Sequence, residues 1–286
     1  AEASRHDRVL AEAATDKVAL LARVASVGDV EQAAARARST VARLGGDGRL
    51  ESWIDTDLAV AMSTDDRHED ALKIHARALE AKTKALGPNH WDVGISEVNV
   101  ANELHELGRD DEALVAIEKA LAAFETAFGP RFPGLAHVFS NRGEIQLALH
   151  RPAEARDDFE KAISIWQTEG PPKGDVEVTS YPLTGLGKAL LAQGKPSEAV
   201  APLEQALRIR NERQSPPGAR AETALALARA LWSSGDRSRA LNLAKEARDL
   251  YPEKKQADRR EAEAALAEWT HTAKQAGIRS AAGRSP

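Results

Sequence analysis

The sequence GRDDEALVAIEKA, at residues 108–120, carries the pattern that decides the fold. A Gly-Arg turn leads into a Glu-Ala dipeptide that ends at Ala113, and a second alanine, Ala120, follows seven residues later. A small residue, Ala101, stands twelve residues before Ala113. The pattern occurs five times with small variations, at intervals of 42, 42, 44 and 41 residues, and its central alanines are Ala71, Ala113, Ala155, Ala199 and Ala240.

The two companion positions repeat in step with these central alanines. The later alanines are Ala78, Ala120, Ala162, Ala206 and Ala247, and the earlier small residues are Ala59, Ala101, Gly143, Gly187 and Ala228. A repeat of this length is one unit of local structure that cannot bury its own apolar face, so neighbouring units must stack. We therefore interpret the alanines as packing positions that fix the register, and expect the side chains between them to carry recognition.

Each repeat reads as a pair of helices. In the copy at residues 91–129, apolar and small residues recur every three or four positions before Gly108, and again between Asp111 and Phe128. Gly108 suits the left-handed end of the first helix, and Asp110 suits the start of the second. The dipeptide Gly129-Pro130 ends the second helix, because proline cannot continue it.

The same turn residues and apolar spacing predict helices along the whole chain. The first helices of the pairs are expected near residues 51–66, 91–107, 133–149, 176–193 and 219–234, and the second near 68–86, 110–128, 152–169, 196–213 and 237–251. The expected organisation is a degenerate helix pair at 1–49, five repeats at 50–251, a capping helix at 252–277 and a disordered tail at 278–286.

Two glycines fall inside one of these expected helices. Gly185 and Gly187 each cost about 1 kcal/mol relative to alanine in a helix interior. Gly187 occupies a small-residue position, so a close helix approach is expected to compensate there. The repeat pattern offers no such reason for Gly185.

Composition limits the class of function. The 286 residues are 42% apolar and 4% aromatic with a formal net charge of −5, so no basic face for nucleic acid is expected. There is no cysteine, which excludes disulfides and thiolate metal sites. No apolar run reaches the roughly 20 residues of a membrane span, and a cytoplasmic protein is expected. The first residues, Ala1-Glu2-Ala3-Ser4, lack a methionine, which indicates a fragment of a longer protein.

The spacing small–x11–Ala–x6–Ala resembles the tetratricopeptide repeat (TPR), and the 42-residue period resembles its kinesin-light-chain type. The resemblance implies an all-α fold, a right-handed α-solenoid of antiparallel helix pairs. Such repeats are frequent behind the kinase domains of bacterial serine/threonine protein kinases. The sequences at 190–194 and 228–232 resemble the carboxyl-terminal ends of those kinases. The resemblance further implies a non-catalytic scaffold that binds a peptide or protein segment in its concave groove, as the interaction or sensing region of a larger bacterial signalling protein.

In this family the first helices line the concave groove, so counting from the small position selects the groove residues. The candidates for peptide binding are Trp53, Thr56, Asn102, His137, Asn141, Glu144, Tyr181, Thr184, Lys188 and Arg229. Asparagine can hydrogen-bond both the N–H and the C=O of an extended peptide. Lys188 and Arg229 occupy equivalent faces of neighbouring repeats, so we expect them to attract an acidic segment.

No catalytic, cofactor-binding or metal-binding motif is recognisable, so no enzymatic activity and no cofactor is expected. The glycine cluster at 45–48 lacks the lysine and the preceding strand of a phosphate-binding loop. Two alternatives to groove binding stay open: self-association, in which the chain forms a homodimer that brings attached domains together, and reception of a small signalling peptide.

Overall fold

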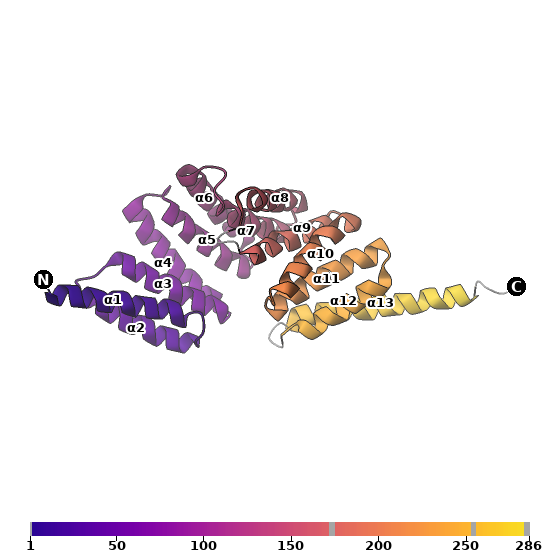
Figure 1. Ribbon diagram of the computed structural model, residues 1–286, viewed down its shortest axis with the longest axis horizontal. Helices are drawn as coiled ribbons and strands as arrows, with labels where there is room; N and C mark the ends of the chain where they lie inside the picture. Colours follow the sequence, from indigo (N-terminus) through magenta and orange to yellow (C-terminus); the bar gives the residue numbers. More distant parts are fainter. Residues whose placement is uncertain (1, 172–174, 253–255, 283–286) are drawn as a thin grey trace. The chain divides into compact units, whose positions relative to one another are not determined.

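The structure is a computed structural model, and it describes residues 2–171, 175–252 and 256–282. Its helices fall into two compact units, unit 1 (Ala1–Pro130) and unit 2 (Arg131–Pro286). Every regular element within the described residues is helical (Figure 1). The chain therefore has the all-α fold that the repeat pattern predicts.

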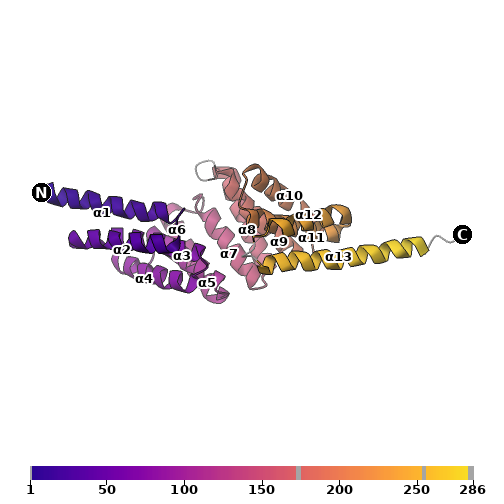
Figure 2. The same ribbon diagram turned by 90° about the horizontal axis from the view of Figure 1, so that it is seen from below.

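Unit 1 contains antiparallel helix pairs that stack in chain order. Each helix packs on the next, and α1 also contacts α3 (Figures 1 and 2). Its helices are α1 (Glu2–Leu21), α2 (Val27–Arg43), α3 (Gly48–Thr64), α4 (His68–Leu86), α5 (Trp91–Glu106) and α6 (Asp110–Phe128). The side chains of α1 to α4 share one hydrophobic core, so the first pair is part of the stack.

Unit 2 continues with the same arrangement. Contacts between alternate helices, α7 with α9 and α9 with α11, show that the first helices of successive pairs lie side by side. Its elements are α7 (Leu135–Ala148), α8 (Pro152–Glu169), the short 3-10 helix η2 (Val176–Thr179), α9 (Ser180–Ala192), α10 (Pro196–Glu212), α11 (Pro217–Ser234), α12 (Arg237–Leu250) and α13 (Gln256–Ala282). At its end, the Trp269 ring of α13 stacks on Trp232 of α11, with centroids 4.9 Å apart.

The helices predicted from sequence are confirmed, with small shifts at their ends. The segment expected as one helix at 176–193 begins as η2 and becomes regular at Ser180, because Pro182 is tolerated only in a first turn. The last helix reaches Ala282 instead of residue 277, since neither proline nor a further glycine occurs between Gly277 and Ala282. Residues 283–286 of the expected tail lie outside the described residues. The division into a degenerate pair, five repeats and a cap stays a prediction.

The repeat alanines are packing positions, as the sequence indicates. All five central alanines, Ala71, Ala113, Ala155, Ala199 and Ala240, have no exposed area. The earlier small residues and the later alanines are buried as well. Together these positions bring the two helices of each pair into close contact.

A left-handed residue recurs five positions before each central alanine, at the turn inside each pair. These residues are Asp66, Gly108, His150, Gly194 and Gly235, with φ of 60°, 71°, 58°, 72° and 103°. Glycine adopts this conformation freely, whereas a side chain in it costs roughly 1–2 kcal/mol. The repeat therefore prefers glycine at a position that His150 occupies in one copy.

Replacing His150 by glycine should stabilise unit 2 by about 0.5–1 kcal/mol, since relief of the left-handed strain outweighs the greater freedom of the unfolded chain. Urea unfolding monitored by circular dichroism measures the change. Gln205→Gly, at an exposed position inside α10, is the matched control and should lose about 1 kcal/mol. A loss of stability in His150→Gly would contradict the assignment.

Both glycines of α9 are required by close packing, so the expectation for Gly185 is corrected. A Cβ at Gly187 would lie 2.3 Å from the Leu203 side chain of α10, in agreement with the close approach expected there. A Cβ at Gly185 would lie 2.3 Å from the ring of Phe159 on α8. The repeat spacing gave no hint of this second contact, because it depends on the size of a residue in the preceding pair.

No helix in the described part of the chain is long and apolar enough to cross a membrane.

Candidate functional site

Three of the predicted groove residues lie in unit 1, and the structure does not gather them in one cavity. Trp53 on α3 is 46% exposed, with the Arg49 guanidinium 5.0 Å from its ring centroid. The Thr56 hydroxyl donates to the Ser52 carbonyl at 2.8 Å, so it is engaged within α3. Asn102 is exposed on α5. A cavity of about 270 Å³ in this unit lies between α1 and α2 and contains none of the three.

Five of the predicted residues line one cavity in unit 2, which we call the Arg210 cavity. They come from α7 and α9, as the repeat register requires, and are His137, Asn141, Glu144, Tyr181 and Thr184. The cavity has a volume of about 270 Å³, and its remaining lining residues are Ser140, Phe159, Trp166, Val178, Arg210 and Glu222. The sequence therefore identifies the side chains that the first helices contribute.

The mouth of the Arg210 cavity is aromatic. Tyr181 is 51% exposed, and its ring lies 5.1 Å from the Arg210 guanidinium carbon, a distance typical of a cation–π contact. Elsewhere in the lining the His137 ring meets Trp166 edge-on, with centroids 4.9 Å apart. These rings offer apolar surface with polar edges, which suits contact with an extended peptide.

Arg210, which forms the floor of this cavity, is buried to 2% exposure on α10. Its Nε donates to Ser180 Oγ at 3.2 Å, and its Nη1 donates to Thr223 Oγ1 at 2.6 Å and to the carbonyl of Ala219. Nη1 also lies 3.4 Å from Glu222 Oε2. A buried charge is tolerated only when it is paired and hydrogen-bonded, and Arg210 meets both conditions.

Sequence reasoning missed Arg210 because it searched only the first helices. Residues at the same place in every repeat, eleven after the central alanine, are large and mostly buried; they are Lys82, Phe124, Trp166, Arg210 and Tyr251. Trp166 and Arg210 both reach the Arg210 cavity from second helices. The mixture of aromatic and cationic side chains at this one repeat position was the signal that could have revealed them.

Lys188 lies between two carboxylates, which corrects the expectation that it attracts an acidic segment. Its Nζ is 2.8 Å from Glu144 Oε2 and 3.1 Å from Glu222 Oε1. Burial alone would lower the pKa of Lys188, but the two carboxylates outweigh burial and raise it above its usual value. Burial likewise opposes ionisation of Glu222, yet Lys188 and Arg210 lower its pKa overall. Lys188 and Glu222 are therefore both charged near neutral pH.

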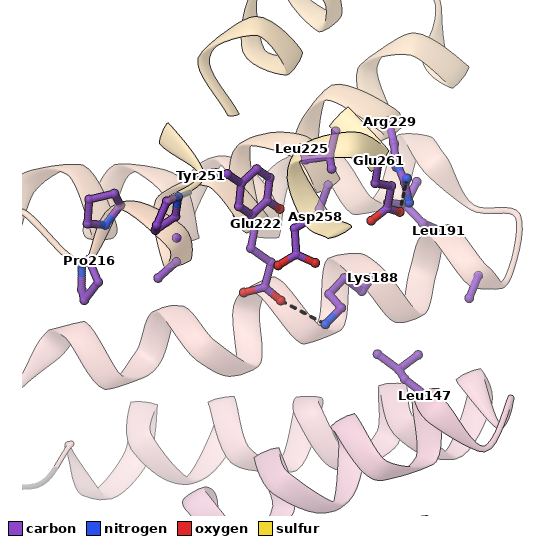
Figure 3. Close-up of a pocket in the computed structure, with 16 residues that line it drawn as sticks. Leu147, Lys188, Leu191, Pro216, Glu222, Leu225, Arg229, Tyr251, Asp258 and Glu261 are labelled. Atoms are coloured by element: carbon purple, nitrogen blue, oxygen red, sulfur yellow. Dashed lines mark hydrogen bonds and ion pairs between the residues drawn. The ribbon is translucent and has the colours of Figure 1, made fainter. Parts of the chain in front are cut away.

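A second, larger cavity adjoins the first through Glu222, and we call it the Tyr251 cavity. It has a volume of about 980 Å³ and is lined by residues of α9, α11 and the start of α13, with Leu147 of α7 facing them (Figure 3). Lys188 and Arg229, both predicted groove residues, line it. Arg229 pairs with Glu261 of α13, so its charge is also compensated.

Thr184 lines the Arg210 cavity with a buried side chain, which is 2% exposed. Its hydroxyl donates to the Ser180 carbonyl at 2.8 Å and lies 3.0 Å from Thr223 Oγ1. Thr184 thus links α9 to α11 beneath the cavity and supports Arg210 through their shared neighbours.

The site offers recognition chemistry and no cluster that would bind a metal. Among the residues with described side chains, no three His, Cys, Asp or Glu side chains are grouped so that they could hold a metal ion. The polar groups of the Arg210 cavity are one arginine, two glutamates and amide, hydroxyl and imidazole side chains. This arrangement can form hydrogen bonds and salt bridges with a bound chain.

The fold places the chain in a class of proteins. Its helix pairs repeat about every 42 residues and pack through buried alanines, which is the arrangement of a TPR-like solenoid. The sequence profile described as Tetratricopeptide repeat matches residues 50–126, 92–168 and 134–212. The chain belongs to the tetratricopeptide repeat family.

Individual relatives confirm the resemblance to the kinesin-light-chain type. Protein KINESIN LIGHT CHAIN-RELATED 3 of Arabidopsis thaliana is 25% identical over 142 residues, which are 50% of this chain and 21% of the relative. The matched region is thus about a fifth of that protein. The crystal structure of BtubC (BKLC) from P. vanneervenii is similar with a TM-score of 0.64 and 22% identity, over 74% of this chain and 87% of that chain.

One similar structure contains a peptide. NprR in complex with its cognate peptide NprX has a TM-score of 0.63 and 14% identity, over 92% of this chain and 72% of that chain. At this identity the likeness shows a shared fold.

Proposed function

We propose that this chain is a scaffold that binds an extended peptide segment of another protein across the first helices of unit 2. The observation that carries the proposal is the Arg210 cavity, where predicted groove residues of α7 and α9 meet around one opening. The adjoining Tyr251 cavity extends the same surface toward α11 and α13. The peptide complex of the structurally similar NprR supports this mode of binding for the fold.

The physical basis is a surface that combines aromatic edges with amide and charged groups. Tyr181 and His137 supply contact area, Asn141 contributes a carboxamide to the lining, and Lys188 pairs with Glu144. A peptide of about ten residues buries less area than a standard protein–protein interface, so dissociation constants near the micromolar range are expected.

The proposal predicts that a peptide library screened against the full chain yields saturable binders, and that Asn141→Ala weakens them about 10-fold. The substitution removes up to two hydrogen bonds, each worth roughly 0.5–1.5 kcal/mol. Fluorescence polarisation with labelled peptides measures the dissociation constants. Asn211→Ala, an exposed asparagine on the second helix α10, is the matched control and should change nothing. Absence of any saturable binder would refute the proposal.

The finer expectations stay predictions. They are a parent protein of the bacterial signalling class, such as a serine/threonine kinase, self-association of the chain, and reception of a small signalling peptide.

A further inference from the structure

The Arg210 cavity holds a hydrogen-bond donor that the fold does not use. Within the described residues, all hydrogen bonds of Arg210 are made by Nε and Nη1, which leaves Nη2 without one. The side chain is 2% exposed and lines the cavity. Nη2 can therefore donate to an acceptor that enters the cavity, and a hydrogen bond from a charged donor is stronger than one between neutral groups.

A second donor without a partner lies in the same wall. Trp166 is 3% exposed, and its indole Nε1 has no hydrogen-bond partner among the described residues. Most buried polar groups are paired, so the unpaired indole N–H of Trp166 in the lining of this small cavity needs an explanation. The His137 ring covers Trp166 edge-on, and a shift of this exposed side chain would open the indole to a ligand.

The charges around the cavity cancel, which restricts the group that would bind there. Arg210, Glu144 and Glu222 line the cavity, and Lys188, which lines the adjoining Tyr251 cavity, pairs with both glutamates, so two positive charges offset two negative charges. A carboxylate in the cavity would meet two carboxylates, and an ammonium would meet the Arg210 cation. A neutral group that both accepts and donates hydrogen bonds has no such conflict, because it finds donors in Arg210 and acceptors in the glutamates.

We propose that the Arg210 cavity selects a primary carboxamide, the side chain of glutamine or asparagine, in the bound peptide. The carboxamide oxygen accepts from Arg210 Nη2, and its NH₂ group donates to Glu144 or Glu222. A volume of about 270 Å³, below the usual range of small-molecule pockets, suits a single side chain. This inference rests on the proposed function, since it assigns one specificity pocket of the same groove.

The test uses three capped pentapeptides that differ at one residue. Each has alanines around a central Gln, Glu or Met, with an acetyl group at one end and an N-methylamide at the other, so that no other primary carboxamide is present. Titration of the full ¹⁵N-labelled chain gives the dissociation constants, and the Trp166 indole and Tyr181 amide signals report on the cavity. The Gln peptide should bind about 10-fold more tightly than the other two and shift both signals.

The possible results separate the two proposals. Met binding as tightly as Gln would mean an apolar pocket, and Glu binding more tightly would mean an anion site; either result overturns the carboxamide inference. Equal binding of all three peptides, weakened equally by Asn141→Ala, would leave groove binding intact and refute selection by the cavity. No binding of any peptide in this series would overturn the carboxamide inference. Binders found in the peptide library would still support the scaffold function.

Arg210→Lys supplies the matched protein variant. It retains the positive charge but loses Nη2, so the ratio of the Met to the Gln dissociation constant should fall to about 1. A retained preference would exclude Arg210 as the selecting donor. Thermal unfolding checks that the variant folds, and the peptide series on the unaltered chain decides the question if it does not.

Discussion

Gly185→Ala should destabilise unit 2 by about 2–3 kcal/mol, although alanine is the better helix former. A Cβ at this position would lie 2.3 Å from the Phe159 ring, closer than any real contact allows. The ring cannot move away easily, because Phe159 has no exposed area and also lies against Gly143, where a Cβ would be 2.7 Å from it. The cost of overpacking therefore exceeds the gain of about 1 kcal/mol in helix propensity.

Urea unfolding measures the loss, and hydrogen exchange shows whether it is confined to α8 and α9. Gly218→Ala is the control in the same unit, because a Cβ there would meet only Pro252 at 3.8 Å. Combining Gly185→Ala with Phe159→Leu should recover part of the loss, since the smaller side chain makes room for the methyl group. If Gly185→Ala were as stable as the unaltered chain, the result would contradict the close approach of α9 to α8.

Unit 1 should lose about 3 kcal/mol of stability between pH 7.5 and pH 4 through His75 alone. This side chain is 2% exposed on α4, and burial, with a smaller contribution from Lys82, lowers its pKa to about 4 from an ordinary value of 6.5. The native state keeps the imidazole neutral, whereas the unfolded chain takes up a proton below pH 6.5. The stabilisation is complete above pH 6.5 and is lost as the pH falls toward 4.

His75→Leu removes the titrating group and retains an apolar side chain of comparable size. The difference in unfolding free energy between pH 7.5 and pH 4 should shrink by about 3 kcal/mol relative to the parent chain. Urea unfolding at a series of pH values supplies the curve. His6→Gln, an exposed position on α1, controls for the loss of one histidine. An unchanged pH dependence in His75→Leu would contradict the burial of a neutral imidazole.

Sequence spacing was sufficient for the fold because the packing positions repeat. Ala113 and its counterparts set the contact inside each pair, and turn residues such as Gly108 set where the helices end. The same register placed Asn141 and Tyr181 correctly at one opening. What periodicity supplies is the direction in which each side chain of a regular helix points.

Contacts between side chains of neighbouring repeats could not be predicted from the repeat spacing. Lys188 pairs with glutamates 44 and 34 residues away in sequence, and Arg210 reaches the cavity from a second helix, whereas the groove residues were sought on the first helices alone. Gly185 is explained by a ring in the preceding pair. These contacts depend on which residues face each other across two stacked pairs. The pattern of a single repeat does not specify the side chains of the neighbouring repeat.

The residue eleven after each central alanine has a wider consequence. It is lysine, phenylalanine, tryptophan, arginine or tyrosine in successive copies, while the alanines that hold the helices together stay the same. Under the proposed function, recognition and architecture are therefore encoded at separate positions of the same repeat. A lineage that duplicated such modules could revise its choice of ligand one substitution at a time, and the scaffold would not have to be rebuilt at any step.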